Sequence, residues 1–182
     1  MEQNEQVRTA VFGGGCFWCT KAIFQMLKGV SKVESGYAGG AMENPSYEKV
    51  SNGNTGHAEV IRVTYDPSII TYEDLLTVFF GSHDPTTPNR QGADVGEQYR
   101  SIILYETPED KATAERIAKE IQESLTDGSR VVTQIVPLGT FFKAEDYHQN
   151  YFKENTSAPY CQIVIEPKIE KVKKRFAELV KQ

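Results

Sequence analysis

The sequence predicts a mixed α/β or α+β domain in which strands and helices alternate along the chain. Short β-branched runs, such as residues 60–65, are separated by longer stretches with apolar residues at helical spacing. The chain has 182 residues, close to one ordinary domain, and contains no repeat or linker-like stretch. Apolar residues make up 39% and charged residues 25%, which is typical of a globular protein. We therefore expect residues 1–182 to form a single domain.

The first half of the chain is expected to contain three strands and two helices. One helix is expected over residues 16–28, where apolar side chains recur at helical spacing and Gly29 ends the pattern. A second helix begins at Thr71, which is followed by Asp74 in a capping-box pattern. The strands are short apolar or β-branched runs that end at glycine or at Asp-Pro, over residues 7–12, 33–37 and 60–65.

The second half repeats this alternation after a loop. Residues 83–98 include two prolines and two glycines, so we expect them to form a loop. Thr107 and Pro108 form a strong helix start, and Asp127-Gly128 ends that helix. Strands are expected over residues 101–105, 131–138 and 163–165, and a further helix over residues 145–154. Pro167 is expected to open a last helix whose inward face holds Ile169, Val172, Phe176 and Leu179.

Charge and hydropathy exclude several classes of protein. The net charge of −5 argues against nucleic-acid binding through a basic face. The sequence has no run of about 18 apolar residues, so we expect no membrane span. Its start, MEQNEQVRTA, lacks an apolar signal region, and three cysteines do not make a secreted disulfide scaffold. We therefore expect a reducing, cytoplasmic location.

The segment GGGCFWC, residues 13–19, carries the densest chemical signal. It places Cys16 where a strand turns into a helix, and unpaired N–H groups and the helix dipole stabilise a thiolate at such a position. The glycines allow another molecule to approach the backbone closely. We interpret Cys16 as a nucleophile beside an aromatic wall of Phe17 and Trp18. The alternative is an inert, buried cysteine next to two core aromatics.

Cys16 and Cys19 also form a Cys-x-x-Cys pair, which by itself indicates thiol–disulfide redox chemistry. The pair could equally begin a zinc site. The other candidate ligands stand singly, without the spacing of a second pair, at Cys161, His57, His83 and His148. We therefore expect no metal centre.

Three polar segments remain, each with a structural alternative. Glu59 stands where a strand begins, and a solvated acid at a strand end is the alternative to a functional one. The glycine-punctuated segment 89–100 could line a site or simply connect elements at the surface. For Tyr147, His148 and Gln149, which lie in an expected helix, we favour a structural role.

Several of these motifs together resemble the A-type peptide-methionine sulfoxide reductases. GGGCFWC, GYAGG, NPSYEKV, TGHAE, residues 89–101 and YHQNY occur in the order seen in that family, over about residues 7–155. The resemblance implies an α/β two-layer sandwich with a ferredoxin-like core, followed by a C-terminal extension over about residues 156–182. It also implies reduction of the S epimer of methionine sulfoxide, free or in proteins, without a cofactor. Thioredoxin, or dithiothreitol in the test tube, would regenerate the thiol.

The resemblance also implies roles for individual residues. Cys16 resembles the nucleophile, and Phe17 and Trp18 resemble the pocket for the methyl group of the substrate. Asp94 resembles the residue that supports this pocket and the substrate backbone. The groups around the sulfoxide oxygen would be Tyr47, Glu59 and Tyr99.

The sequence departs from the family pattern at the recycling thiol. A small residue is usual where Cys19 stands, and many members carry the recycling cysteine in a Gly-rich tail. Here Cys161 lies near that position but is flanked by apolar residues. Either Cys161 or Cys19 could condense with an oxidised Cys16, and the family position favours Cys161.

These residues fit the reaction on physical grounds. A sulfoxide oxygen leaves only if it is protonated as the thiolate attacks sulfur, and a carboxylic acid with tyrosine hydroxyls can supply that proton. Burial of Glu59 near Phe17 and Trp18 would raise its pKa and keep it protonated. Two other classes stay open: a general thiol–disulfide oxidoreductase using Cys16 and Cys19, and a module that binds oxidised methionine without turnover.

Overall fold

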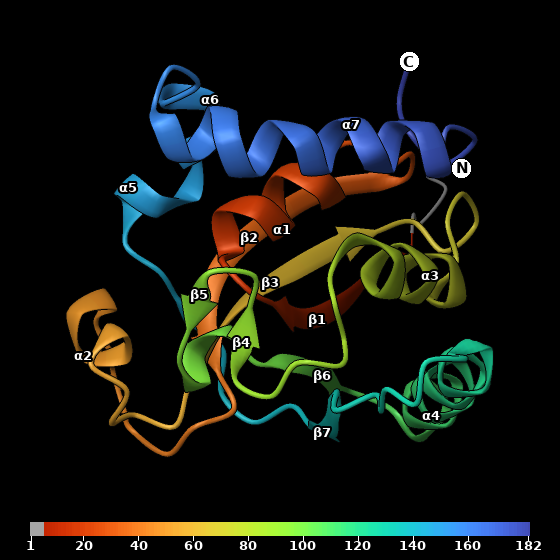
Figure 1. The fold of residues 1–182 in the computed structure, drawn as a ribbon, viewed down its shortest axis with the longest axis horizontal. Coiled ribbons are helices and arrows are strands. Elements are labelled where there is room, and N and C mark those ends of the chain that lie inside the picture. The colour runs from red at the N-terminus through yellow and green to blue at the C-terminus, as the bar shows by residue number, and fades with distance from the viewer. Residues whose placement is uncertain (1–5) are drawn as a thin grey trace.

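A six-stranded mixed sheet with the strand order β7-β6-β1-β3-β2-β8 forms the centre of the computed structural model, which describes residues 6–182 (Figure 1). A two-stranded hairpin, β4-β5, stands apart from it. Along the chain the elements are β1 (Arg8–Gly14), α1 (Phe17–Phe24), β2 (Val30–Ala38), α2 (Tyr47–Ser51), β3 (Ala58–Tyr65), α3 (Tyr72–Ser82), β4 (Arg90–Gln91), β5 (Asp94–Val95), the 3₁₀ turn η1 (Glu97–Tyr99), β6 (Ser101–Tyr105), α4 (Pro108–Ser124), β7 (Gln134–Pro137), β8 (Phe142–Lys143), α5 (Asp146–Gln149), α6 (Tyr151–Glu154), the π-helical segment η2 (Cys161–Ile165) and α7 (Glu166–Arg175).

The inner four strands have the ferredoxin-like arrangement that the resemblance implies. The order of connection is β1-α1-β2, then β3-α3-β6, and each inner strand is antiparallel to its neighbours. The outer strand β7 pairs in parallel with β6, and β8 pairs antiparallel with β2. The predicted mixed α/β class is therefore confirmed.

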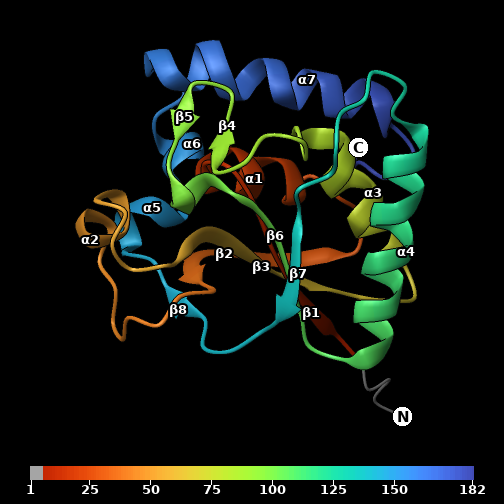
Figure 2. The ribbon, with the colours of Figure 1, turned by 60° about the horizontal axis from the view of Figure 1, so that its bottom comes forward.

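Helices cover one face of the sheet and a loop covers the other. Figures 1 and 2 show α1, α3 and α7 on one side, with α4 flanking α3. Phe12, Ile61 and Ile103 point toward these helices, whereas Val60 and Ile102 belong to the core on the opposite face. This alternation follows from the two-residue period of a strand. Leu138 and Phe141, from the segment between β7 and β8, pack on that second face.

The register of the sheet brings distant segments together at one end. Gly14, the last residue of β1, pairs with Ser101, the first of β6, and Tyr37 near the end of β2 pairs with Glu59 near the start of β3. Neighbouring strands are antiparallel, so the end of one lies beside the start of the next. Cys16 follows β1 and Tyr99 precedes β6, and both therefore lie at this end of the sheet.

The expected strand over residues 163–165 is wrong, because this segment is helical. Cys161 and Ile165 are buried while Ile163 is 74% exposed, a four-residue spacing that continues into Ile169 of α7. Pro167 lacks the N–H that would bond one turn back, and the wider π-helical turn of η2 lies just before it. Pro167 stands in the first turn of α7, as predicted, and η2 runs directly into that turn.

Other boundaries differ because tertiary pairing overrides the local pattern. Helix α1 ends at Phe24, not residue 28, since the N–H of Lys28 bonds to the carbonyl of Leu179. The helix expected over residues 145–154 is split at Asn150, whose φ of −135° and ψ of 35° are not helical. The strand expected over residues 131–138 is reduced to β7, and residues 83–98 contain the hairpin β4-β5. Three further short elements, α2, η1 and β8, were not predicted.

The C-terminal segment packs back onto the helical layer. Helix α7 contacts both α1 and α3, and Figure 1 shows it lying across them. The backbone N–H of Lys181 bonds to the carbonyl of Met26, and its ammonium group bonds to the carbonyls of Gln25 and Val30. Within residues 6–182, no helix is long and apolar enough to cross a membrane.

Candidate active site

Cys16 occupies the N-cap position of α1, directly after the glycine turn. Gly15 has a φ of +102°, a conformation that L side chains rarely adopt, and a Cβ there would approach Gln91 to within 2.9 Å. A Cβ on Gly13 would come within 2.9 Å of the Glu59 carbonyl oxygen. The glycines therefore let β1 lie close to β3 and bring the thiol next to Glu59.

Glu59 is buried and points toward the first turn of α1. Its Oε1 accepts a hydrogen bond from the backbone N–H of Phe17 at 3.1 Å. Burial raises the pKa of Glu59 to about 8, although the Phe17 N–H lowers it and the charge of Asp94 adds to the rise. The carboxyl group therefore holds its proton at neutral pH. Glu59 is only 2% exposed, so it is not the solvated acid at a strand end that was the alternative interpretation.

Two tyrosines lie within electrostatic reach of this carboxyl group. Tyr47 begins α2 and Tyr99 ends η1. Burial is the main cause that raises the pKa of each phenol, and the charge of Glu59 raises both further. Both hydroxyls therefore keep their protons and can donate hydrogen bonds. The structure thus brings together all the residues predicted around the sulfoxide oxygen.

The thiol pair differs from the expected helix-stabilised thiolate. The pKa of Cys16 is raised well above its ordinary value, first by the hydrogen bond it shares with Cys19, then by burial and by the charge of Glu59. The same hydrogen bond lowers the pKa of Cys19 to about 7, against the effect of burial. One turn of backbone N–H groups does not outweigh burial beside a carboxyl group. With no substrate bound, Cys16 is protonated at pH 7.

Aromatic rings form a wall beside Cys16. Phe17 is fully buried and lies 5.7 Å from the Tyr37 ring, centroid to centroid. Trp18 is half-buried and stacks on Tyr151 with the rings 3.7 Å apart and 10° from parallel. The two residues predicted as the pocket for a methyl group thus lie next to the thiol, on the same helical turn.

Asp94 is tied to the C-terminal segment by a residue that sequence reasoning missed. The Tyr160 hydroxyl donates to Asp94 Oδ2 at 3.0 Å and lies 3.8 Å from Cys19 Sγ. Cys161 follows Tyr160, is fully buried, and belongs to the same apolar cluster as Cys16 and Cys19. Both candidate resolving thiols therefore lie near Cys16. Proximity to Cys161 was the only signal in the sequence for Tyr160.

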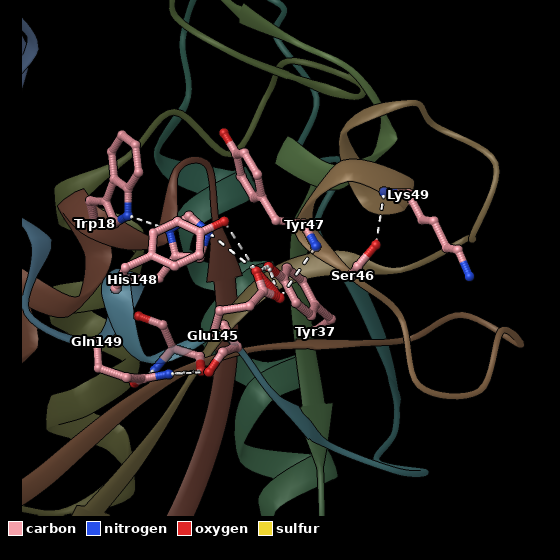
Figure 3. Close-up of polar contacts among 11 residues, drawn as sticks. Trp18, Tyr37, Ser46, Tyr47, Lys49, Glu145, His148 and Gln149 are labelled. Carbon is pink, nitrogen blue, oxygen red and sulfur yellow. Dashed lines mark hydrogen bonds and ion pairs between the residues drawn. The ribbon is translucent and has the colours of Figure 1, made fainter.

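Glu145 and His148 were also missed as site residues, although both lie in or beside the motif YHQNY. Trp18 Nε1–H donates to His148 Nδ1 at 3.1 Å (Figure 3). Glu145 accepts hydrogen bonds from the Tyr37 hydroxyl and the Tyr47 backbone N–H, each at 3.3 Å. The segment after β8 therefore supports the aromatic residues of the site through hydrogen bonds to Trp18, Tyr37 and Tyr47.

The two other histidines, His57 and His83, are held by hydrogen bonds within the protein. His57 Nδ1 accepts from the Gly40 N–H at 3.0 Å, and its Nε2 lies 2.7 Å from the Met42 carbonyl oxygen. His83 is half-buried, its Nε2 lies 2.8 Å from Ser101 Oγ, and desolvation of the ring lowers its pKa to about 4. Over residues 6–182, no group of three or more His, Cys, Asp or Glu side chains could hold a metal ion.

Two adjacent thiols next to a carboxyl group that keeps its proton at neutral pH define a thiol-dependent oxidoreductase on a ferredoxin-like sheet. Comparison with known proteins specifies the family: residues 8–180 match the family described as Peptide methionine sulfoxide reductase. The chain belongs to this family and is a peptide methionine sulfoxide reductase of the MsrA type.

Individual relatives match this chain over most of their length. The chain is 52% identical to Peptide methionine sulfoxide reductase MsrA of Sulfolobus acidocaldarius, covering 94% of this chain and 97% of the relative. Identity to the MsrA of Deinococcus radiodurans is also 52%, covering 93% and 82%. Among solved structures, methionine sulfoxide reductase A of Corynebacterium diphtheriae has a TM-score of 0.81 at 34% identity, covering 86% of this chain and 78% of that one. Reduced Mxr1 from Saccharomyces cerevisiae has a TM-score of 0.80 at 33% identity, covering 88% and 92%.

Proposed function

We propose that this enzyme reduces the S epimer of methionine sulfoxide, free or in proteins, through a sulfenic acid on Cys16. The observation that carries the proposal is the raised pKa of Glu59, about 8. This side chain accepts a hydrogen bond from the backbone N–H of Phe17, the residue after Cys16. A carboxyl group that is protonated at neutral pH is the donor that a departing sulfoxide oxygen needs.

The chemistry balances within the residues of the site. Cys16 Sγ attacks the sulfoxide sulfur, and Glu59 passes its proton to the oxygen while Tyr47 and Tyr99 donate hydrogen bonds to it. The attack forms a bond between Cys16 Sγ and the substrate sulfur; this bond and the substrate S–O bond then break as the hydroxyl passes to Sγ, giving methionine and a sulfenic acid on Cys16. The proton that Cys16 loses restores the Glu59 carboxyl group. The substrate sulfur is reduced by two electrons and Cys16 is oxidised by two.

Epimer selectivity follows from the placement of these groups. The methyl group would lie against Phe17 and Trp18, with sulfur–aromatic contacts worth roughly 0.3–1.5 kcal/mol, while the oxygen faces Glu59. Asp94, half-buried beside the site, would hold the substrate backbone. The methyl group, the oxygen and the methylene that leads to the substrate backbone are then all fixed around the chiral sulfur. Only one epimer can fit these positions and still expose its sulfur to Cys16.

The test is turnover of the two separated epimers with dithiothreitol, measured as methionine released. We expect the S epimer to be reduced and the R epimer to be reduced little. Equal rates on both epimers would contradict the proposed pocket. Binding of the sulfoxide without release of methionine would instead indicate a recognition module.

For the resolving step, the geometry favours Cys19 over the family-based preference for Cys161. Cys19 lies in the first turn of α1, which Cys16 caps, and in the reduced protein its pKa is lowered to about 7. Cys161 lies on a different element, the helical segment η2, and is held there by the apolar cluster that it shares with Ile165 and Ile169. We therefore propose that Cys19 condenses with the sulfenic acid first, releasing water.

Single-turnover oxidation of the two variants separates these routes. After one equivalent of substrate, Cys161→Ser should still form a Cys16–Cys19 disulfide, mapped by mass spectrometry. Cys19→Ser should accumulate the sulfenic acid or form the Cys16–Cys161 bond more slowly. If Cys19→Ser forms a disulfide at the normal rate and Cys161→Ser forms none, Cys161 is the resolver.

Thioredoxin is the proposed physiological reductant. The fold of this chain is also that of Mxr1 from Saccharomyces cerevisiae in complex with Trx2, with a TM-score of 0.57 at 24% identity. That complex motivates the choice of partner. We place the reaction in the cytoplasm, a proposal that rests on three cysteines without disulfides and on the need for a reduced thiol pool.

A further inference from the structure

His148 is a buried histidine that the proposed mechanism does not use, yet it contacts the walls of the pocket. Its ring centroid lies 5.0 Å from Phe17, 5.7 Å from Trp18 and 4.5 Å from Tyr47. These three residues come from α1 and α2, whereas His148 comes from α5. Figure 3 shows the imidazole between Trp18 and Glu145. One side chain therefore joins the two elements that flank the thiol.

The hydrogen bond from Trp18 fixes the state of this imidazole. The indole nitrogen can only donate, so His148 Nδ1 must be the unprotonated, accepting nitrogen of a neutral ring. The ring proton then lies on Nε2, which makes no hydrogen bond and has Glu145 Oε2 at 3.5 Å. Burial lowers the pKa of His148, and the charge of Glu145 opposes this. The phenols of Tyr47 and Tyr147 also face the ring.

The hydrogen bond to His148 matters for the Trp18 indole because its other contacts do not prevent movement of the ring within its own plane. Stacking on Tyr151, with the rings 10° from parallel, fixes the plane of the indole but allows it to slide and rotate within that plane. Tyr160 meets the indole edge-on at 5.9 Å and is held by Asp94. Nε1–H is the polar group on the rim of the indole, so a bond from it to a rigid acceptor stops rotation within the plane.

We propose that His148 is a positioning residue for substrate specificity, which locks the in-plane orientation of Trp18 through Nδ1. Glu145 supports it by lying beside Nε2 while its oxygens accept from Tyr37 and Tyr47. The inference rests on the proposed function, because it takes Trp18 as the wall of the methyl pocket. The locked indole defines where the methyl group of the sulfoxide can lie.

A pair of variants separates positioning from simple core packing. His148→Asn keeps an acceptor, Oδ1, at the place of Nδ1, whereas His148→Leu fills the space without one. We expect kcat/KM for the S epimer to fall about tenfold in His148→Leu, the effect of one net hydrogen bond. His148→Asn should restore it to within about threefold of the wild type. If His148→Leu does not fold, His148→Gln replaces it, because its amide oxygen lies one bond too far out.

The emission of Trp18 provides a readout that does not depend on activity, since it is the sole tryptophan of the sequence. Its steady-state anisotropy should fall in His148→Leu and stay near wild type in His148→Asn. Equal kcat/KM and equal anisotropy in the two variants, with only the melting temperature changed, would overturn the positioning role. Failure of the wild-type enzyme to reduce the S epimer would count against the proposed function, while the anisotropy result would still test the bond.

Discussion

At the scale of single residues, the protonated carboxyl group of Glu59 is the centre of the account. Its burial and the nearby charge of Asp94 raise its pKa to about 8, against the hydrogen bond from the Phe17 N–H, which lowers it. Cys16 is protonated for related reasons. Attack on sulfur needs a thiolate on Cys16 and a proton on Glu59 at the same time. The reactive state of Cys16 and Glu59 is therefore the one in which the two groups together hold a single proton.

Glu59→Gln should slow reduction of the S epimer by roughly 10²–10⁴-fold, the range for loss of a general acid. The wild-type kcat/KM should rise with pH as the pair loses its first proton near pH 8, then fall once the second is lost. The limb near pH 8 should be missing in Glu59→Gln. Measurement of kcat/KM between pH 5 and 10 checks both points. A variant with near-normal rates would show that Glu59 is not the proton donor.

The single residues also show what the sequence could reveal. The motif containing Cys16 and the resemblance together predicted Glu59, Tyr47, Tyr99 and Asp94, and the structure places them around the thiol. His148 was assigned a structural role, because a histidine within a predicted helix gives no indication of which ring it contacts. Its partner Trp18 lies far away in the sequence, so only the folded structure shows the hydrogen bond between them.

At the scale of elements, the turn between β1 and α1 sets the position of the nucleophile. Gly15 adopts a φ of +102° against the side chain of Gln91, whose amide in turn bonds to both backbone groups of Asp84. The turn and the segment after α3 are thus locked to each other. A shift in either element moves Cys16 relative to Glu59.

Gly15→Ala should therefore reduce kcat/KM more than it reduces stability. Its Cβ strains the backbone and displaces Gln91, and misplacement of a nucleophile by about 1 Å can cost on the order of 100-fold in rate. Gly53→Ala is the matched control, because Gly53 has a φ of +78° with no atom near the added Cβ. Kinetics and urea unfolding of both variants would be compared. Equal kinetics in the two variants would show that the turn does not position Cys16.

Element boundaries were less predictable than element types, and the reasons are tertiary. The apolar run over residues 163–165 looks like a strand when read alone, but burial of Cys161, Ile165 and Ile169 follows helical spacing. Residues 27–28 left the helical pattern because Leu27 pairs with Val180 and Lys28 bonds to Leu179. A local pattern contains no information about such partners.

At the scale of the whole molecule, the active site reduces the stability of the fold. Glu59 has an ordinary pKa of 4.5 when unfolded and about 8 when folded. Between these values the folded state keeps a proton that the unfolded chain has lost, so stability falls as the pH rises through this window. Above about pH 8 the loss is complete and the contribution is constant.

Glu59→Gln should remove this loss, because the amide is neutral in both states. We expect the variant to gain on the order of 2–4 kcal/mol over the wild type between pH 4.5 and pH 8.5. Urea unfolding of both proteins at several pH values gives this difference directly. Parallel stability curves for the two proteins would mean that Glu59 is ionised in the fold.

The central claim is that Cys16 itself takes the sulfoxide oxygen. Its most direct test is a single turnover of the Cys19→Ser, Cys161→Ser double variant, in which no second thiol can condense with the product. With excess S epimer and no reductant, we predict one methionine released per enzyme molecule and a sulfenic acid on Cys16, trapped by dimedone and located by mass spectrometry. Release of no methionine, or a trapped adduct at any residue other than Cys16, would contradict the account.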